Sequence, residues 1–142
     1  MANDVSKLRD GMDIALCVYD PNSKKLSYAG ANNPLYLLSK NELKEFKANK
    51  QPIGRFENKV AFTNHDMQLE TGDSVYIFSD GIADQFGGTD GKKFKYKRLK
   101  ELLLKIQTRP MDEQKRTIVS TVLDWRGELE QIDDVCIFGV KF

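Results

Sequence analysis

One carboxylate lies at the end of an apolar run in the middle of the chain. Residues 74–81 read Ser-Val-Tyr-Ile-Phe-Ser-Asp-Gly, so apolar and aromatic side chains give way to Asp80 and a glycine. A buried strand that ends in an acid can hold a metal ion or a catalytic carboxylate at the rim of a sheet. Asp and Gly also favour tight turns for local backbone reasons, so a plain turn is the simpler interpretation of this segment alone. A functional role for Asp80 requires a partner elsewhere in the sequence.

A second acidic motif near the C-terminus could supply that partner. Asp133 and Asp134 directly precede the apolar segment 135–142. If this segment and the run at 74–78 are antiparallel neighbours, Asp80 lies at the same sheet edge as Asp133 or Asp134. Converging carboxylates repel one another unless a cation lies between them, and oxygen ligands suit Mg²⁺ or Mn²⁺. The alternative is a solvated connection between a helix and a strand, and the residues alone do not decide between the two.

The elements that must position these acids are short strands and two helices. Apolar spacing at Phe94, Leu99 and Ile106 predicts a helix over about 96–107, and Pro110 is expected to start a second one. Strands that are segregated from helices predict an α+β fold, with the helices on one face of a mostly antiparallel sheet. The predicted strands cover residues 13–20, 26–29, 35–39, 43–47, 62–69, 74–78 and 135–142.

Composition excludes several classes of partner. The net charge is +1, from 22 basic and 21 acidic residues, so no global field attracts nucleic acid or anionic lipid. The basic segment 92–98 also contains aromatic residues, but at this net charge it predicts a helix with its aromatic side chains in the core. No apolar run approaches the length of a membrane span. Cys17 and Cys136 lie in apolar segments and are predicted to be buried free thiols of a cytoplasmic protein, with a disulfide as the alternative.

Several motifs in this order resemble the metal-dependent (type 2C-like) serine/threonine phosphatases, in the branch typified by the stage II sporulation protein E domain. The resemblance covers nearly the whole chain from Asp10 onward. A subset of these domains, fused behind sensor or helical-repeat regions, is also similar at residues 83–88. The motifs are Asp10-Gly11-Met12-Asp13, residues 28–35 (Tyr-Ala-Gly-Ala-Asn-Asn-Pro-Leu), Gln51-Pro52-Ile53-Gly54, Leu69 with Gly72-Asp73, Phe78-Ser79-Asp80-Gly81 and residues 133–137 (Asp-Asp-Val-Cys-Ile).

The resemblance implies a fold, a reaction and a set of site residues. The fold would be an antiparallel β-sandwich flanked by helices, with a two-metal Mn²⁺ or Mg²⁺ site at one end. Water would attack the phosphorus of a phosphoserine or phosphothreonine, so no side-chain nucleophile is needed. Asp80 and Asp133 match the family's catalytic metal ligands, and Asp134 is a further candidate ligand. The substrate class that the family suggests is a phosphorylated regulatory protein of the anti-anti-sigma type.

One family motif has no counterpart in this sequence. Family members carry an earlier Asp followed by Gly-His-Gly, whereas the only histidine here is His65. Residues 10–142 are therefore expected to be the C-terminal portion of the domain without its N-terminal strands, and residues 1–9 a disordered or vector-derived lead-in. Such a chain would bind metal poorly and be inactive or weakly active. An exposed sheet edge would favour self-association. The alternative function is a non-catalytic protein-binding module with a degenerate phosphatase fold.

Overall fold

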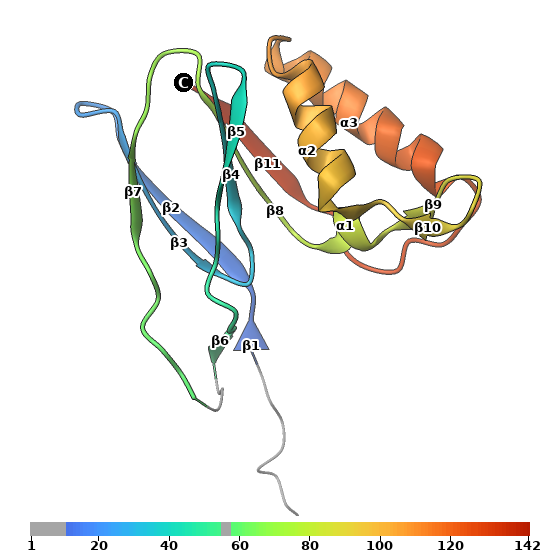
Figure 1. Cartoon of the computed structure of the whole chain (residues 1–142), viewed down its shortest axis with the longest axis horizontal. Helices are drawn as coiled ribbons and strands as arrows, with labels where there is room; N and C mark the ends of the chain where they lie inside the picture. Colours follow the sequence, from blue (N-terminus) through green and yellow to red (C-terminus); the bar gives the residue numbers. More distant parts are fainter. Residues whose placement is uncertain (1–10, 55–57) are drawn as a thin grey trace, which may run out of the picture.

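The computed structural model describes residues 11–54 and 58–142 (Figure 1). The predicted lead-in at residues 1–9 lies outside these described residues. The elements in chain order are β1 (Gly11–Met12), β2 (Ile14–Asp20), β3 (Lys25–Ala31), β4 (Leu35–Ser39), β5 (Glu42–Phe46), β6 (Ile53–Gly54), β7 (His65–Gln68), β8 (Ser74–Phe78), α1 (Gly81–Asp84), β9 (Phe86–Gly87), β10 (Lys92–Lys93), α2 (Lys95–Ile106), α3 (Met111–Arg126) and β11 (Ile137–Lys141).

Two antiparallel sheets form the centre of the fold. Strands β2, β3 and β7 make one sheet in the order β2-β3-β7, and the second sheet has the order β11-β8-β4-β5. Apolar side chains from both sheets, such as Tyr28 and Leu37, form a core between them. The opposite face of the four-stranded sheet packs against α2 and α3, through residues such as Tyr76, Leu103 and Ile118 (Figure 1). The predicted α+β fold, an antiparallel sandwich with flanking helices, is confirmed.

Both predicted hairpins are present, and their turns explain why the chain reverses there. Strands β2 and β3 pair antiparallel, as do β4 and β5. Lys40 and Asn41 join the second pair with φ angles of 51° and 64°. Positive φ at both central residues gives a turn whose twist matches that of the strands, and Asn tolerates this conformation well.

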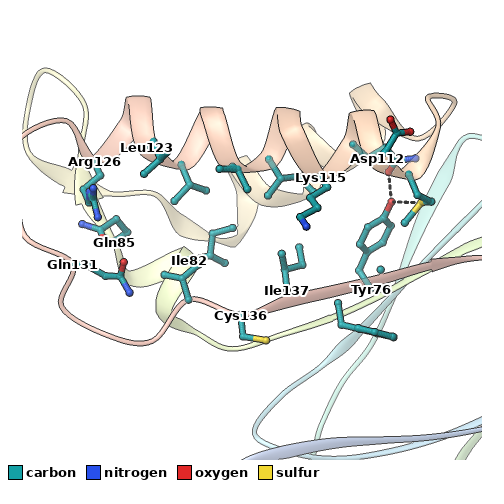
Figure 2. A pocket seen from close by; sticks show the side chains of 18 residues that line it. Tyr76, Ile82, Gln85, Asp112, Lys115, Leu123, Arg126, Gln131, Cys136 and Ile137 are labelled. Carbon is teal, nitrogen blue, oxygen red and sulfur yellow. Dashed lines mark hydrogen bonds between the residues drawn. The ribbon is translucent and has the colours of Figure 1, made fainter.

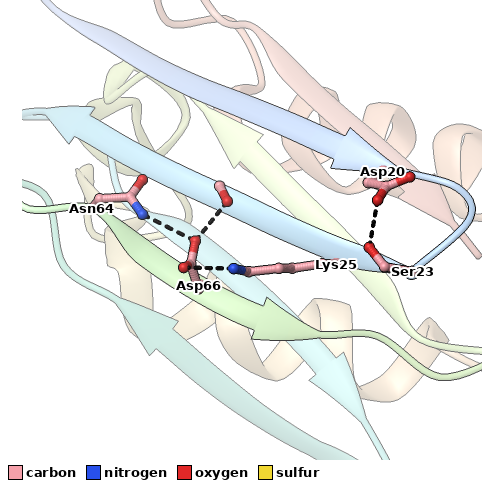
Figure 3. A network of polar contacts seen from close by, with 6 residues as sticks. Asp20, Ser23, Lys25, Asn64 and Asp66 are labelled. Carbon is pink, nitrogen blue, oxygen red and sulfur yellow. Dashed lines mark hydrogen bonds and ion pairs between the residues drawn. The ribbon is translucent and has the colours of Figure 1, made fainter.

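A polar network joins the long loop before β7 to the three-stranded sheet (Figure 3). The Asp66 carboxylate accepts hydrogen bonds from the Ser27 hydroxyl at 2.6 Å and the Asn64 amide at 3.0 Å. Lys25 forms an ion pair with it at 2.9 Å. These partners stabilise the charged form, and they lower the pKa of Asp66 to about 2.

Helix α3 is anchored to the sheet by a buried polar residue. The Gln114 side chain is 1% exposed and accepts a hydrogen bond from the Tyr76 hydroxyl. Its amide donates to the main-chain oxygens of Gln107 and Arg109, at 3.2 and 2.8 Å. One side chain therefore holds together a strand, the start of α3 and the connection between α2 and α3.

Three sequence predictions of local structure are wrong in part. The predicted strand 62–69 is shorter, since β7 covers His65–Gln68. Proline and glycine at residues 51–54 predict a loop, but Ile53–Gly54 form β6, which pairs with β1. The glycines at 87–91 predict a loop, and residues 88–91 do form a turn, but Gly87 belongs to β9 of a short hairpin with β10. These strands of two to four residues are too short to leave a periodic pattern in the sequence.

The two strand segments predicted to be buried, 13–20 and 135–142, are largely exposed. Leu16, Val18 and Phe138 have 58%, 64% and 60% of their surfaces exposed. Ala15 and Cys17 pack toward the core between the two sheets, so the alternate residues Leu16 and Val18 lie on the outer face of the three-stranded sheet. In the described part of the chain, β11 is the end strand of its sheet. Cys136 is correspondingly exposed and Cys17 half-buried, and both are free thiols, so the buried position predicted for Cys136 is wrong. No helix among the described residues is long and apolar enough to cross a membrane.

Candidate functional site

The register of two strands brings the predicted acids to one end of the four-stranded sheet, where β8 finishes and β11 begins. Strands β8 and β11 are antiparallel neighbours, and Phe78 at the end of β8 lies opposite Ile137 at the start of β11. The pairing continues for one more step, because the Ser79 N–H donates to the Cys136 carbonyl at 3.0 Å. The segment that leaves β8 and the segment that enters β11 therefore run side by side, as expected from the sequence.

The Ser79 side chain holds these two segments together. Its hydroxyl donates to the main-chain oxygen of Asp134 at 2.7 Å and accepts from the Cys136 N–H at 2.9 Å. Gly81 allows the same close approach, because a Cβ at this position would collide with the main-chain oxygen of Asp134. The Ser-Asp-Gly motif thus has a packing role on both sides of Asp80.

Asp80 precedes α1 with its carboxylate free of a capping role. Its main-chain oxygen accepts the Asp84 N–H at 3.0 Å, and its side chain makes no capping hydrogen bond. Partial burial raises the pKa of Asp80, and the nearby carboxylates of Asp133 and Asp84 raise it further. The charges of Asp80 and Asp84 contribute in turn to a raised pKa at Tyr96, after the larger effect of burial. Asp80 therefore lies among other negatively charged carboxylates.

The two acids of the C-terminal motif are placed differently. Asp133 lies close enough to affect the pKa of Asp80, and its carboxylate accepts the Asp134 N–H at 2.7 Å. The main chain of Asp134 is packed against Ser79 and Gly81. Among the residues that the structure describes, the Asp134 carboxylate forms no hydrogen bond or ion pair. The fold brings Asp80 and Asp133 together and leaves the Asp134 carboxylate beside them.

The donor set fits a divalent cation of the Mg²⁺ or Mn²⁺ type. Two carboxylates that repel one another become compatible when a cation lies between them, and both offer only oxygen ligands. The third nearby acid, Asp84, is already paired with Lys93 at 2.8 Å. Within residues 11–54 and 58–142, no three His, Cys, Asp or Glu side chains are grouped closely enough to hold a metal ion. Asp80 and Asp133 are therefore the two candidate ligands in the described part of the chain.

Sequence reasoning missed four residues that shape this site: Ser79, Gly81, Asp84 and Tyr96. The first two belong to the motif that drew attention to Asp80, but a turn explains them equally well from sequence. Asp84 lies four residues after Asp80, the spacing that places two side chains on one face of a helix, and this signal could have been used. Tyr96 carries no such signal, because its place near Asp80 depends on how α2 packs.

Comparison with known proteins shows the family to which this chain belongs. The family model described as Stage II sporulation protein E (SpoIIE) matches residues 3–142. The SiaA PP2C domain of Pseudomonas aeruginosa is 31% identical with a TM-score of 0.83, and the match covers 92% of this chain and 51% of that one. No curated protein sequence shows a significant match.

More distant structures share the fold. The phosphatase domain of the cell fate determinant SpoIIE from Bacillus subtilis is 17% identical with a TM-score of 0.71, over 98% of this chain and 62% of that one. The RsbU and RsbW domains of Rv1364c from Mycobacterium tuberculosis are 18% identical with a TM-score of 0.70, over 91% and 35%. The chain spans about half of the SiaA domain and less than two thirds of the B. subtilis one. By the match over residues 3–142, the chain belongs to the stage II sporulation protein E family, a group of PP2C-like phosphatase domains of bacterial signalling proteins.

Proposed function

We propose that this chain is part of a metal-dependent phosphatase domain that acts on phosphoserine or phosphothreonine in a regulatory protein. The supporting observation is that Asp80 and Asp133 lie close together where β8 finishes and β11 begins, in a chain of the SpoIIE family. Residues 10–142 are the C-terminal portion of that domain in this proposal. This agrees with the span of 51% of the SiaA domain.

The proposed catalytic residues are Asp80 and Asp133, as ligands of Mn²⁺ or Mg²⁺, with Asp134 as a further ligand. When bound, divalent cations supply Lewis acidity toward the phosphoryl group and a nucleophilic water at neutral pH. The chain's own contribution is to hold the two carboxylates in place. The Ser79 hydroxyl and the contact between Gly81 and Asp134 fix the distance between the two segments that carry them.

The substrate class follows from the family and from its relatives. One relative combines an RsbU domain with an RsbW domain, and another is described as a key regulatory component of a secretion system in P. aeruginosa. A phosphorylated regulatory protein, of the anti-anti-sigma type, is accordingly the proposed substrate. The two free thiols support a reducing, cytoplasmic location.

Phosphate release from a phosphoserine protein in the presence of Mn²⁺ tests this function. The measurement needs a polypeptide with the full length of the relatives' domain, because the present chain spans only part of it. We expect Asp80→Asn to lose most of the rate, while Asp90→Asn, at an exposed position paired with Lys92, retains it. Equal rates for the wild type and Asp80→Asn would contradict the assignment.

A second candidate function, a protein-binding module, is favoured by the open side of the sandwich. Tyr19 on β2 contacts Phe142 next to β11, with ring centroids 4.7 Å apart, so the β2 edge of one sheet and the β11 edge of the other lie on the same side. A cavity of about 690 Å³ lies between α3 and β11 (Figure 2). Exposed edges with apolar side chains pair readily with other chains. We therefore propose self-association through these edges, which sedimentation velocity at several protein concentrations will detect.

A further inference from the structure

A second, smaller hollow lies near the candidate catalytic edge. It has a volume of about 270 Å³, and its walls come from the loop before β4, the end of β5, the segment after β5 and the start of α2. Two lysines and a tyrosine ring line it together with shorter side chains. Its lining residues include Asn32, Glu45, Lys47, Lys50 and Tyr96.

This hollow and Asp80 lie at the same end of the four-stranded sheet. Leu35, the first residue of β4, is paired with Ile77 of β8, so the loop before β4 lies beside the segment that leads to Asp80. The Tyr96 ring faces the Phe78 ring with centroids 6.1 Å apart. Asp80 follows Phe78 by two residues, which separates the two by at most about 7 Å. A peptide bound with one residue at Asp80 would therefore reach the hollow with residues only a few positions away.

The hollow carries an excess of positive charge. Glu45, its one acidic lining residue, forms an ion pair with Lys100 at 2.7 Å. Within the described parts of the chain, Lys47 and Lys50 form no ion pair, and both are exposed. The lining residue Asn32 donates a hydrogen bond to the Asp13 carboxylate at 2.7 Å, but a neutral amide leaves the negative charge of Asp13 in place. Among the described residues, the ammonium groups of Lys47 and Lys50 therefore have no acidic partner, and the nearby charges at Asp80 and Asp133 are negative.

We propose that this hollow binds acidic side chains of the protein substrate, within about four residues of its phosphorylated residue. The inference rests on the proposed function for the placement of the phosphorylated residue at Asp80. Carboxylates of the substrate complement the charges of Lys47 and Lys50. Without these lysines, the negative charges of Asp80 and Asp133 would repel an acidic peptide. The hollow selects acidic flanking sequence and orients the peptide, and it takes no part in phosphate transfer.

Binding of two peptides to the 142-residue chain tests this inference directly. Both contain one phosphoserine. One peptide has Glu at the second to fourth positions on each side, and the other has Gln there. Fluorescence anisotropy at low ionic strength gives the two affinities for the wild type and for K47Q/K50Q. The matched control is K40Q/K105Q, which removes the same charge at the far ends of β4 and α2.

The expected result is a loss of binding affinity that depends on both the peptide and the variant. K47Q/K50Q should weaken binding of the Glu peptide about three- to tenfold, the range for two exposed charge pairs. The Gln peptide should be unaffected, and the control variant should leave both affinities within about twofold. Equal affinities of the wild type for the two peptides, or equal losses in both variants, would overturn the proposal.

Phosphate release from the same peptides separates this inference from the proposed function. A domain that releases phosphate at equal rates from the Glu and Gln peptides is a phosphatase without this subsite. A full-length domain that binds the Glu peptide through Lys47 and Lys50 but releases no phosphate in the presence of Mn²⁺ retains the subsite and contradicts the phosphatase assignment. The two proposals therefore fail in different measurements.

Discussion

The main-chain oxygen of Asp134 lies so close to Gly81 that a Cβ at position 81 would collide with it. This contact joins the end of β8 to the segment that enters β11, across the two acids of the candidate site. Glycine at this position is required by a tertiary contact, and not by an unusual backbone angle, because residue 81 is the first residue of a short helix. The distance between Asp80 and Asp133 therefore depends on residue 81.

Gly81→Ala should destabilise the fold and separate the two acids. The new methyl group must push the Asp134 main chain away, and overpacking of this kind costs about 1–3 kcal/mol. Urea denaturation gives the change in the free energy of unfolding. Gly91→Asn is a suitable control, since Gly91 has a φ of 58° and open space around it, and Asn tolerates that conformation. A Gly81→Ala protein as stable as the control would show that the loop shifts without cost.

Asp133→Asn should lower the pKa of Asp80. Burial raises the pKa of Asp80 above its usual 3.8, and the charge of Asp133 is the next largest cause. Removal of that charge leaves the burial effect and the smaller effect of Asp84, so the pKa of Asp80 should fall toward 3.8 without reaching it. NMR titration of the Asp80 carboxyl carbon in both proteins gives the shift. An unchanged pKa of Asp80 would mean that the two carboxylates do not interact.

The raised pKa of Asp80 also predicts how stability depends on pH. The folded state holds this proton more tightly than the unfolded state, so Asp80 favours folding at low pH. That contribution is lost as the pH rises from 3.8 through the folded-state pKa. The contribution of Asp66 to stability depends on pH in the opposite direction. Because its pKa is lowered in the folded state, that contribution is lost as the pH falls from 3.8 to about 2.

The measurable quantity is therefore the difference between the wild type and Asp80→Asn. Asp66 is unchanged in both proteins and cancels in this difference. Asp80→Asn should gain stability relative to the wild type as the pH rises above 3.8. A difference that stays constant with pH would contradict a raised pKa at Asp80.

Sequence alone predicts the acid pair because the signal is local and the geometry is simple. Each acid lies at the end of an apolar segment, and one assumption, that the two strands are antiparallel neighbours, brings Asp80 and Asp133 together. That assumption is confirmed by the pairing of β8 with β11. The contact between Gly81 and Asp134 cannot be predicted in this way, because a glycine after an aspartate is equally typical of a turn.

Exposure of the edge strands is the feature that an apolar pattern predicts least well. The segments around Val18 and Phe138 are apolar enough to suggest burial on both faces. An apolar pattern shows that a strand favours contact with other apolar groups, but not whether the described chain supplies them. The same pattern predicts a buried Cys136, whereas this residue, just before β11, is exposed.

Gln114→Ala should be among the most destabilising polar substitutions in the chain. The change removes partners from the Tyr76 hydroxyl and from two main-chain oxygens, and it leaves a cavity beneath α3. Each buried group left without a partner costs about 1–3 kcal/mol, so a total loss of about 3 kcal/mol is expected. Tyr76→Phe removes one of these hydrogen bonds and should cost about 1 kcal/mol. Chemical denaturation of both variants, with exposed Ser120→Ala as the control, provides the comparison.

Val18→Lys and Phe138→Lys should weaken self-association without unfolding the protein. Both side chains are more than half exposed, at 64% and 60%, so a lysine can extend into water from either position. A charge on an edge strand opposes pairing with a second chain. Because little buried surface is lost, the free energy of unfolding should change by no more than about 0.5 kcal/mol.

Sedimentation velocity across a range of concentrations distinguishes edge pairing from general apolar association. Leu129→Lys is the matched control, since Leu129 is 46% exposed but lies in the loop after α3, away from both edges. Edge pairing predicts a shift toward monomer for Val18→Lys and Phe138→Lys and none for Leu129→Lys. An equal shift in all three variants would assign the association to exposed apolar surface in general. A wild-type chain that stays monomeric throughout the range would contradict the proposed self-association.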